Sequence, residues 1–232
     1  MLDLAHAKSH VQLVAHIRDL VATPFSGQIN AMCYPRELSG DFAEIVNKIP
    51  FSENLLEIDE EDLLGLKLSR EGEIARDTLI NDLQFLRASG TAPSLNLIKH
   101  YEKDQELAIF PTDVYSYHVD RSPVPTDTYL CTYHGAASDF LPNAAVTQKI
   151  LIPEIKAELL KLYEGPEEGF EAFLTENFFD LHYQALPNAR PINLGQGNLW
   201  KLAVDHPESQ VLPCVHRAPA EIDGKTRLML IC

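Results

Sequence analysis

Two histidines and one aspartate are the side chains of this sequence best suited to chemistry. His118 and Asp120 are separated by a single residue, and His216 lies far beyond them in the chain. In a β-strand residues i and i+2 point to the same side, so His118 and Asp120 would share a face. Two imidazoles and one carboxylate can occupy one side of a metal ion and leave the other side open, as in non-haem Fe(II) sites. We therefore predict that His118, Asp120 and His216 bind a metal.

An arginine near the end of the chain suits a role beside this metal. Arg227 precedes the apolar run 228–231 and follows a turn signal at 223–225. A hairpin there would bring its guanidinium toward the metal, where its planar fork matches a carboxylate in two hydrogen bonds. We therefore predict a dicarboxylate co-substrate, with one end on the metal and the other on Arg227. Arg217, which directly follows His216, is a competing anchor.

Four further side chains are weaker candidates. Tyr129 and Tyr133 have strand-like spacing and could both donate hydrogen bonds to a carboxylate in the pocket, although packed aromatic residues explain them as well. Arg121 and Trp200, together with Arg217, are candidates for substrate contact. Their structural alternatives are a surface position for Arg121 and a core position for Trp200.

The first part of the chain, residues 1–91, has mostly helical patterns. Apolar residues form a helical stripe from residue 4 to 21, ended by Pro24. A second helix is expected from Ser39 or Asp41 to about Lys48, and the acidic run 59–62 reads as a solvated helix start. The clearest helix is predicted over 73–88, with Gly90 just beyond its end.

The second part, residues 92–232, is rich in strand signals. Strands are predicted over 112–118, 128–133, 191–194, 198–204, around 214–216, and over 227–231. A helical insert interrupts them at about 147–178. The pattern predicts the α+β class, and specifically a jelly roll of the cupin type, with the N-terminal helices and the insert packed against its sheets. We expect one compact domain overall.

Composition limits the functions that are open to this chain. Its 34 acidic and 19 basic residues give a net charge of −15. Such a surface repels phosphate backbones, so we expect no nucleic-acid partner. There is no stretch with the length of a membrane span and no signal-peptide pattern, and the four cysteines form no C-x-x-C pair. We therefore expect a cytoplasmic protein without a membrane partner.

These motifs resemble known families. The series His118-x-Asp120, His216 and Arg227, followed by an apolar strand, is similar to the Fe(II)/2-oxoglutarate-dependent oxygenase superfamily, whose fold is a double-stranded β-helix. The segments 118–121, 130–135 and 215–219 also resemble the bacterial family called domain of unknown function 1826, over roughly residues 105–232.

The oxygenase resemblance implies an enzyme that uses Fe(II), dioxygen and 2-oxoglutarate to oxidise a small molecule. His118, Asp120 and His216 would ligate iron, and Arg227 would bind the far carboxylate of the keto acid. Two alternatives stay open, namely a cupin-like metalloenzyme without keto acid and a non-catalytic metal-binding or ligand-binding protein. It also stays open whether the N-terminal helices cover the pocket or build a homodimer.

Overall fold

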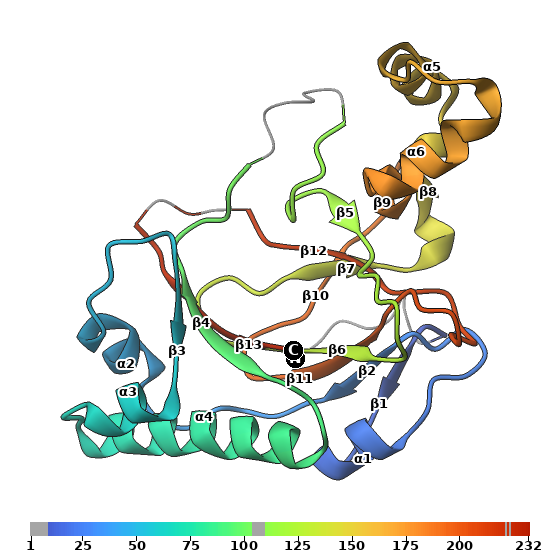
Figure 1. Ribbon diagram of the computed structural model, residues 1–232. Coiled ribbons are helices and arrows are strands. Elements are labelled where there is room, and N and C mark those ends of the chain that lie inside the picture. Colours follow the sequence, from blue (N-terminus) through green and yellow to red (C-terminus); the bar gives the residue numbers. More distant parts are fainter. Residues whose placement is uncertain (1–8, 104–109, 221, 223) are drawn as a thin grey trace.

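Two β-sheets form the centre of the protein. The computed structural model describes residues 9–103, 110–220, 222 and 224–232 (Figure 1). The larger sheet has the order β1-β2-β11-β6-β13-β4-β3 and the smaller sheet the order β10-β7-β12-β5-β9-β8. All adjacent strands are antiparallel except β1 and β2. The larger sheet is curled, and the class predicted from sequence, α+β, is confirmed.

The strands of the larger sheet are β1 Val11–Leu13, β2 Ala31–Tyr34, β3 Leu55–Ile58, β4 Ser94–Ile98, β6 Asp127–His134, β11 Leu199–Ala203 and β13 Arg227–Ile231. Those of the smaller sheet are β5 Tyr117–His118, β7 Asp139–Leu141, β8 Val146–Gln148, β9 His182–Ala185, β10 Ile192–Asn193 and β12 Val215–Arg217. The helices of the described residues are α1 Ile17–Ala22, α2 Phe42–Lys48, α3 Glu60–Gly65, α4 Arg70–Ala88, α5 Pro153–Leu162 and α6 Phe170–Glu176, with 3-10 turns η1 Asn143–Ala145, η2 Lys149–Leu151, η3 Glu167–Gly169 and η4 Phe179–Leu181.

Local sequence signals set the helices of the N-terminal part. Asp41 accepts a hydrogen bond from the Glu44 amide at the start of α2, and Asp59 forms a capping box at the start of α3. The longest helix, α4, begins after Ser69, whose hydroxyl accepts from the Gly72 amide, and Gly90 follows its end with φ +89°. Three of the helices predicted there are thus confirmed, with small shifts of their bounds.

The same part of the chain also contributes strands that the sequence patterns did not reveal. Residues 11–13, predicted as part of a helix, form β1, which pairs in parallel with 31–33 of β2. Of the residues predicted as this helix, 4–8 lie outside the described part of the chain, and among the described ones a helix is present only from Ile17 onward, ending at Ala22. The part predicted as helical therefore supplies β1, β2 and β3 to the larger sheet. Pairing with distant strands overrides the weak local preference of such short runs.

A turn shortens the strand predicted over 112–118. The Asp113 carboxylate accepts from the Tyr115 amide at 3.1 Å, and its carbonyl accepts from the Ser116 amide at 3.2 Å. An aspartate that bonds to backbone two or three residues later favours a turn. Only Tyr117 and His118 remain in the strand β5.

The two faces of the larger sheet have different neighbours. Helices α2 and α4 cover one face, where Leu79, Leu83 and Leu86 of α4 pack in one cluster with Cys131 and Leu230. The opposite face contributes to a second cluster that lies between the two sheets. This cluster includes Leu130, Trp200 and Met229 from the larger sheet, and Phe140 from the smaller one. The helical insert α5–α6 projects from the far end of the smaller sheet (Figure 1).

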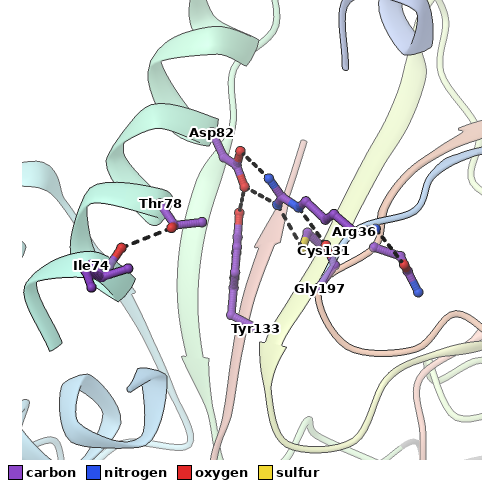
Figure 2. Close-up of polar contacts among 8 residues, drawn as sticks. Arg36, Ile74, Thr78, Asp82, Cys131, Tyr133 and Gly197 are labelled. Atoms are coloured by element: carbon purple, nitrogen blue, oxygen red, sulfur yellow. Dashed lines mark hydrogen bonds and ion pairs between the residues drawn. The ribbon is translucent and has the colours of Figure 1, made fainter. Parts of the chain in front are cut away.

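A buried ion pair fixes α4 to the larger sheet. Asp82 of α4 forms a two-pronged contact with the guanidinium of Arg36 and accepts a hydrogen bond of 2.6 Å from the Tyr133 hydroxyl (Figure 2). The Nε of Arg36 donates to the Gly197 carbonyl at 2.7 Å. Every oxygen of this carboxylate is therefore paired, as a buried charge requires.

Candidate metal centre

Three side chains meet on the inner face of the smaller sheet. His118 of β5 pairs directly with His216 of β12, and their ring centres are 4.6 Å apart. Asp120 follows β5, with its carboxylate oxygens 4.0 Å from Nε2 of His118 and 3.7 Å from Nε2 of His216. One potential ligand atom from each residue lies within 4.8 Å of the other two. The convergence predicted from the sequence is therefore present, at spacings slightly wider than the roughly 3 Å between neighbouring ligands of a bound ion.

Backbone carbonyls orient both imidazoles for metal binding. Nδ1 of His118 bonds to the Ser116 carbonyl at 2.8 Å, and Nδ1 of His216 bonds to the Cys214 carbonyl at 3.1 Å. A carbonyl can only accept, so Nδ1 carries the proton, and in the neutral ring Nε2 presents its lone pair. Both Nε2 atoms point toward Asp120, and a carbonyl on the other ring nitrogen is the usual support of a metal-binding histidine.

The aspartate is held from the other sheet. Thr128 of β6 donates a hydrogen bond of 2.6 Å to Oδ2 of Asp120. The Asp120 carbonyl accepts from the Asp205 amide at 2.8 Å, which fixes the backbone beside it. Thr128 and Asp205, from two other segments of the chain, thus fix the side chain and the backbone of Asp120, respectively.

The charge states of His118 and Asp120 suit a cation. Burial, reinforced by the neighbouring His216, lowers the pKa of His118 to about 4, so its imidazole is neutral at neutral pH. Burial raises the pKa of Asp120, but His216, the Thr128 hydroxyl and His118 together outweigh it, and the pKa lies below the usual value. A neutral imidazole and an ionised carboxylate are the forms that bind metals. The donor set therefore fits a divalent ion.

Arg227 lies inside the molecule, on the neighbouring sheet. Its Nε donates to the Ala136 carbonyl at 2.8 Å, and Nη2 lies 3.4 Å from Oγ of Ser138. Burial lowers its pKa, while the hydrogen-bonded hydroxyl of Tyr101 opposes that shift. A cavity of about 20 Å³ borders Arg227, Tyr101 and Tyr115, and none of the three metal-site residues lines it. A cavity of this size holds about one water molecule, so a dicarboxylate requires the surrounding side chains to move.

The two tyrosines proposed as co-substrate contacts point away from the metal centre. Tyr129 and Tyr133 do share a face of β6, but this face packs against the helices. The Tyr133 hydroxyl donates to Asp82, as described above. Because side chains alternate along a strand, Thr128 faces the metal centre while Tyr129 faces the helices. The structure thus gives both tyrosines a place in the core instead of the expected place in the pocket.

The three residues proposed for substrate contact have protein partners. Arg121 pairs with Asp180 at 2.6 Å and with Asp205 at 2.8 Å. Arg217 extends to the face of β12 opposite His216, where it lies over the Tyr117 ring and 3.3 Å from Asp139. Trp200 is buried between the sheets against Phe140 and donates from Nε1 to the Leu194 carbonyl at 2.8 Å. Arg217 therefore does not compete with Arg227 for an anchor role.

The sequence patterns missed the groups that support the site. Thr128, the Ser116 carbonyl and the Cys214 carbonyl carry no recognisable motif, because each acts through its place in the fold. His182 is a similar case, since it pairs with His118 across β5 and β9. The shared two-residue offset of Ser116 before His118 and of Cys214 before His216 becomes informative only once the hydrogen bonds are known.

Comparison of the chain with models of protein families, with curated proteins and with solved structures finds no match. No helix of the described residues is both long and apolar enough to cross a membrane. The chemistry of the site is therefore inferred from its own geometry.

Proposed function

We propose that this protein is an Fe(II)- and 2-oxoglutarate-dependent oxygenase with a jelly-roll core, acting on a small molecule. The observation that carries the proposal is the His118, Asp120 and His216 cluster, with both Nε2 lone pairs directed at one carboxylate. Two imidazoles and one carboxylate leave up to three positions of an octahedral ion for small molecules. This is the arrangement that an oxygenase of this type requires.

The residues of this chain would have distinct roles. His118, Asp120 and His216 would hold the ion, and Thr128 would keep one oxygen of Asp120 engaged so that the other faces the metal. Arg227 would bind the distal carboxylate of 2-oxoglutarate, since it is a buried cation on the inner side of the larger sheet. The bound iron and keto acid would supply the activation of dioxygen, which no side chain of the chain can provide.

A metalloenzyme that needs no keto acid is the second candidate. One observation favours it: Arg227 already donates to Ala136 and contacts Ser138, Met229 and Tyr101. An arginine with so many protein partners can have a purely structural role. In that case the triad would hold a metal whose open positions accept water or substrate directly.

Anaerobic titration with Fe(II) and then 2-oxoglutarate tests the proposal. We expect one equivalent of iron to bind, and the keto acid to produce a weak visible charge-transfer band. His216→Ala should weaken iron binding by at least about 100-fold, more than loss of a supporting residue does. The matched control, His16→Ala, changes an exposed imidazole at the start of α1, outside the cluster, and should leave both readouts unchanged.

A variant of Arg227 distinguishes the 2-oxoglutarate-dependent oxygenase from the metalloenzyme without keto acid. Arg227→Ala should abolish the charge-transfer band while iron still binds, because the variant removes only the distal anchor. Iron binding without any band in the unmodified protein, together with no succinate formation, would favour the metalloenzyme without keto acid. Failure of the unmodified protein to bind any divalent ion would refute both candidates.

A further inference from the structure

Lys149 is a partly buried cation whose described partners are all neutral. Its Nζ donates to Oγ of Ser116 at 3.2 Å and to the Pro111 carbonyl at 3.3 Å. It also lies 4.9 Å from the centre of the Phe110 ring. In the part of the chain that the structure describes, no carboxylate is within ion-pair distance of this ammonium group. The positive charge is therefore not matched by a contacting anion.

Among the described residues, Arg227 and Lys99 share with Lys149 the lack of a contacting carboxylate. With 34 acidic and 19 basic residues, carboxylates outnumber cations and are available to pair with them. The well-buried Lys201, for comparison, lies 3.2 Å from Asp127. Burial lowers the pKa of Lys149, and the more distant Asp113 only partly opposes this shift. A desolvated charge without a counter-ion is costly, so a retained one suggests an external anion.

Lys149 stands at the end of a row of side chains that contains the metal centre. On the inner face of the smaller sheet, His216 pairs with His118 and His118 pairs with His182. Gln148 pairs with Tyr183, so Lys149 comes opposite His182 in the continuing register. Three imidazoles and one ammonium group thus follow one another across the strands β12, β5, β9 and the end of β8.

Ser116 connects the lysine to the metal site. Its carbonyl bonds to Nδ1 of His118, while its hydroxyl lies 3.0 Å from Nδ1 of His182 and accepts from Lys149. Two hydrogen bonds, the Ser116 residue between them and one imidazole ring separate the ammonium from the metal position. The distance is therefore on the order of 10 Å, which suits the length of a small organic acid.

The two cations near the site lie on opposite sides of it. Arg227 contacts Ser138, which directly precedes β7, whereas Lys149 directly follows β8. In the smaller sheet, β7 lies on one side of β12 and β5, and β8 and β9 lie on the other. Two anions could therefore approach the triad from two directions, one for each cation.

We propose that Lys149 binds the anionic group of the substrate, and hence that the substrate is a small molecule with a carboxylate or phosphate. The Ser116 hydroxyl, which also contacts His182, holds the ammonium in place, and Phe110 provides an apolar surface beside it. The inference rests on the proposed function for its reference to a substrate. The anion site itself does not require a metal.

Titration of the metal-free protein with simple anions tests the inference. The probes are benzoate and inorganic phosphate, with benzamide as the uncharged match of benzoate. Binding is followed by calorimetry and by the NMR signal of the His182 ring, which is assigned with the His182→Gln variant. This signal separates binding near Lys149 from binding near Arg227. We expect benzoate or phosphate to shift the signal and benzamide to leave it unchanged.

The positive charge of residue 149 should determine the affinity of the protein for benzoate or phosphate. Lys149→Met should weaken anion binding at least about tenfold, the lower end for a charge-assisted hydrogen bond, and Lys149→Arg should retain it. Lys156→Met is the matched control, because Lys156 lies on the same insert, over the Phe170 ring at 6.0 Å. If Lys149→Met lowers the melting temperature strongly, Lys149→Gln removes the charge and keeps a hydrogen-bond donor.

The outcomes separate this inference from the proposed function. Equal anion binding by the Lys149→Met and Lys156→Met variants would overturn the inference, as would an equal effect of benzamide and benzoate. Those results leave the iron and 2-oxoglutarate titrations unaffected. Conversely, Lys149-dependent anion binding in a protein that takes up no metal would support the anion site and refute the oxygenase.

Discussion

Replacing Asp82 with asparagine should destabilise the protein strongly and leave the metal centre intact. The Asp82 side chain is 5% exposed and that of Arg36, its ion-pair partner, is 16% exposed. The asparagine keeps the size of the side chain but cannot accept on both branches, and it leaves the guanidinium without a counter-ion. Removing one partner of a buried pair costs about 3–5 kcal/mol. For a domain of this length, that loss lowers the melting temperature by about 6–20 °C.

Chemical denaturation with urea gives the free energy of unfolding directly. The Asp77→Asn variant is the control, because Asp77 lies on the same helix, has a side chain that is 65% exposed, and among the described residues has Arg76, at 3.4 Å, as its one ion-pair partner. An exposed pair of this kind contributes roughly 0–1 kcal/mol. Replacing the whole pair by apolar residues, with Arg36→Met and Asp82→Leu together, should recover much of the loss. Recovery follows because no charge remains buried.

Metal affinity is the second readout of the same variant. Asp82 contacts the helix-covered face of β6 through Tyr133, whereas Thr128 on the opposite face contacts Asp120. We expect iron binding by the Asp82→Asn variant to match that of the unmodified protein below its melting temperature. A stability loss smaller than about 1 kcal/mol would contradict the electrostatic reasoning, as would a double variant less stable than Asp82→Asn alone.

Two other variants test the support of the metal ligands. Thr128→Val keeps the shape of the side chain and removes the 2.6 Å hydrogen bond to Asp120, so metal affinity should fall about tenfold in a competition titration; an unchanged affinity would mean that this bond does not position the ligand. Arg121→Lys retains the charge and loses the fork that joins Asp180 and Asp205. We expect about 1 kcal/mol lower stability, measured in urea, and a smaller change in metal affinity than for Thr128→Val; a larger affinity change would show that the ion pairs dominate the position of Asp120.

The pair His118 and Asp120 could be predicted from sequence because its spacing has a direct geometric meaning. The offset of two between His118 and Asp120 places both on one side of an extended chain. The helices α2, α3 and α4 were likewise predictable, since caps such as Asp41, Asp59 and Ser69 act on amides only three residues away. In both cases the cause lies within a few residues of the effect.

Strand partners and the orientation of single side chains depended on contacts between distant segments. Residues 11–13 form a strand because 31–33 lie beside them, and no local pattern marks that partnership. Tyr133 faces α4 and not the metal centre because β6 is buried on both sides, which removes the alternation of polar and apolar residues that would reveal its orientation.

The sequence by itself therefore determined the chemical character of the site, namely two imidazoles and a carboxylate that can share a cation. The tertiary structure decided which groups orient these ligands and which side chains surround them. Thr128 and His182 came to the site through the pairing and packing of the strands, which depend on contacts between segments far apart in the chain. A spacing rule along one segment cannot encode such a relation, because it exists only after the two sheets have formed.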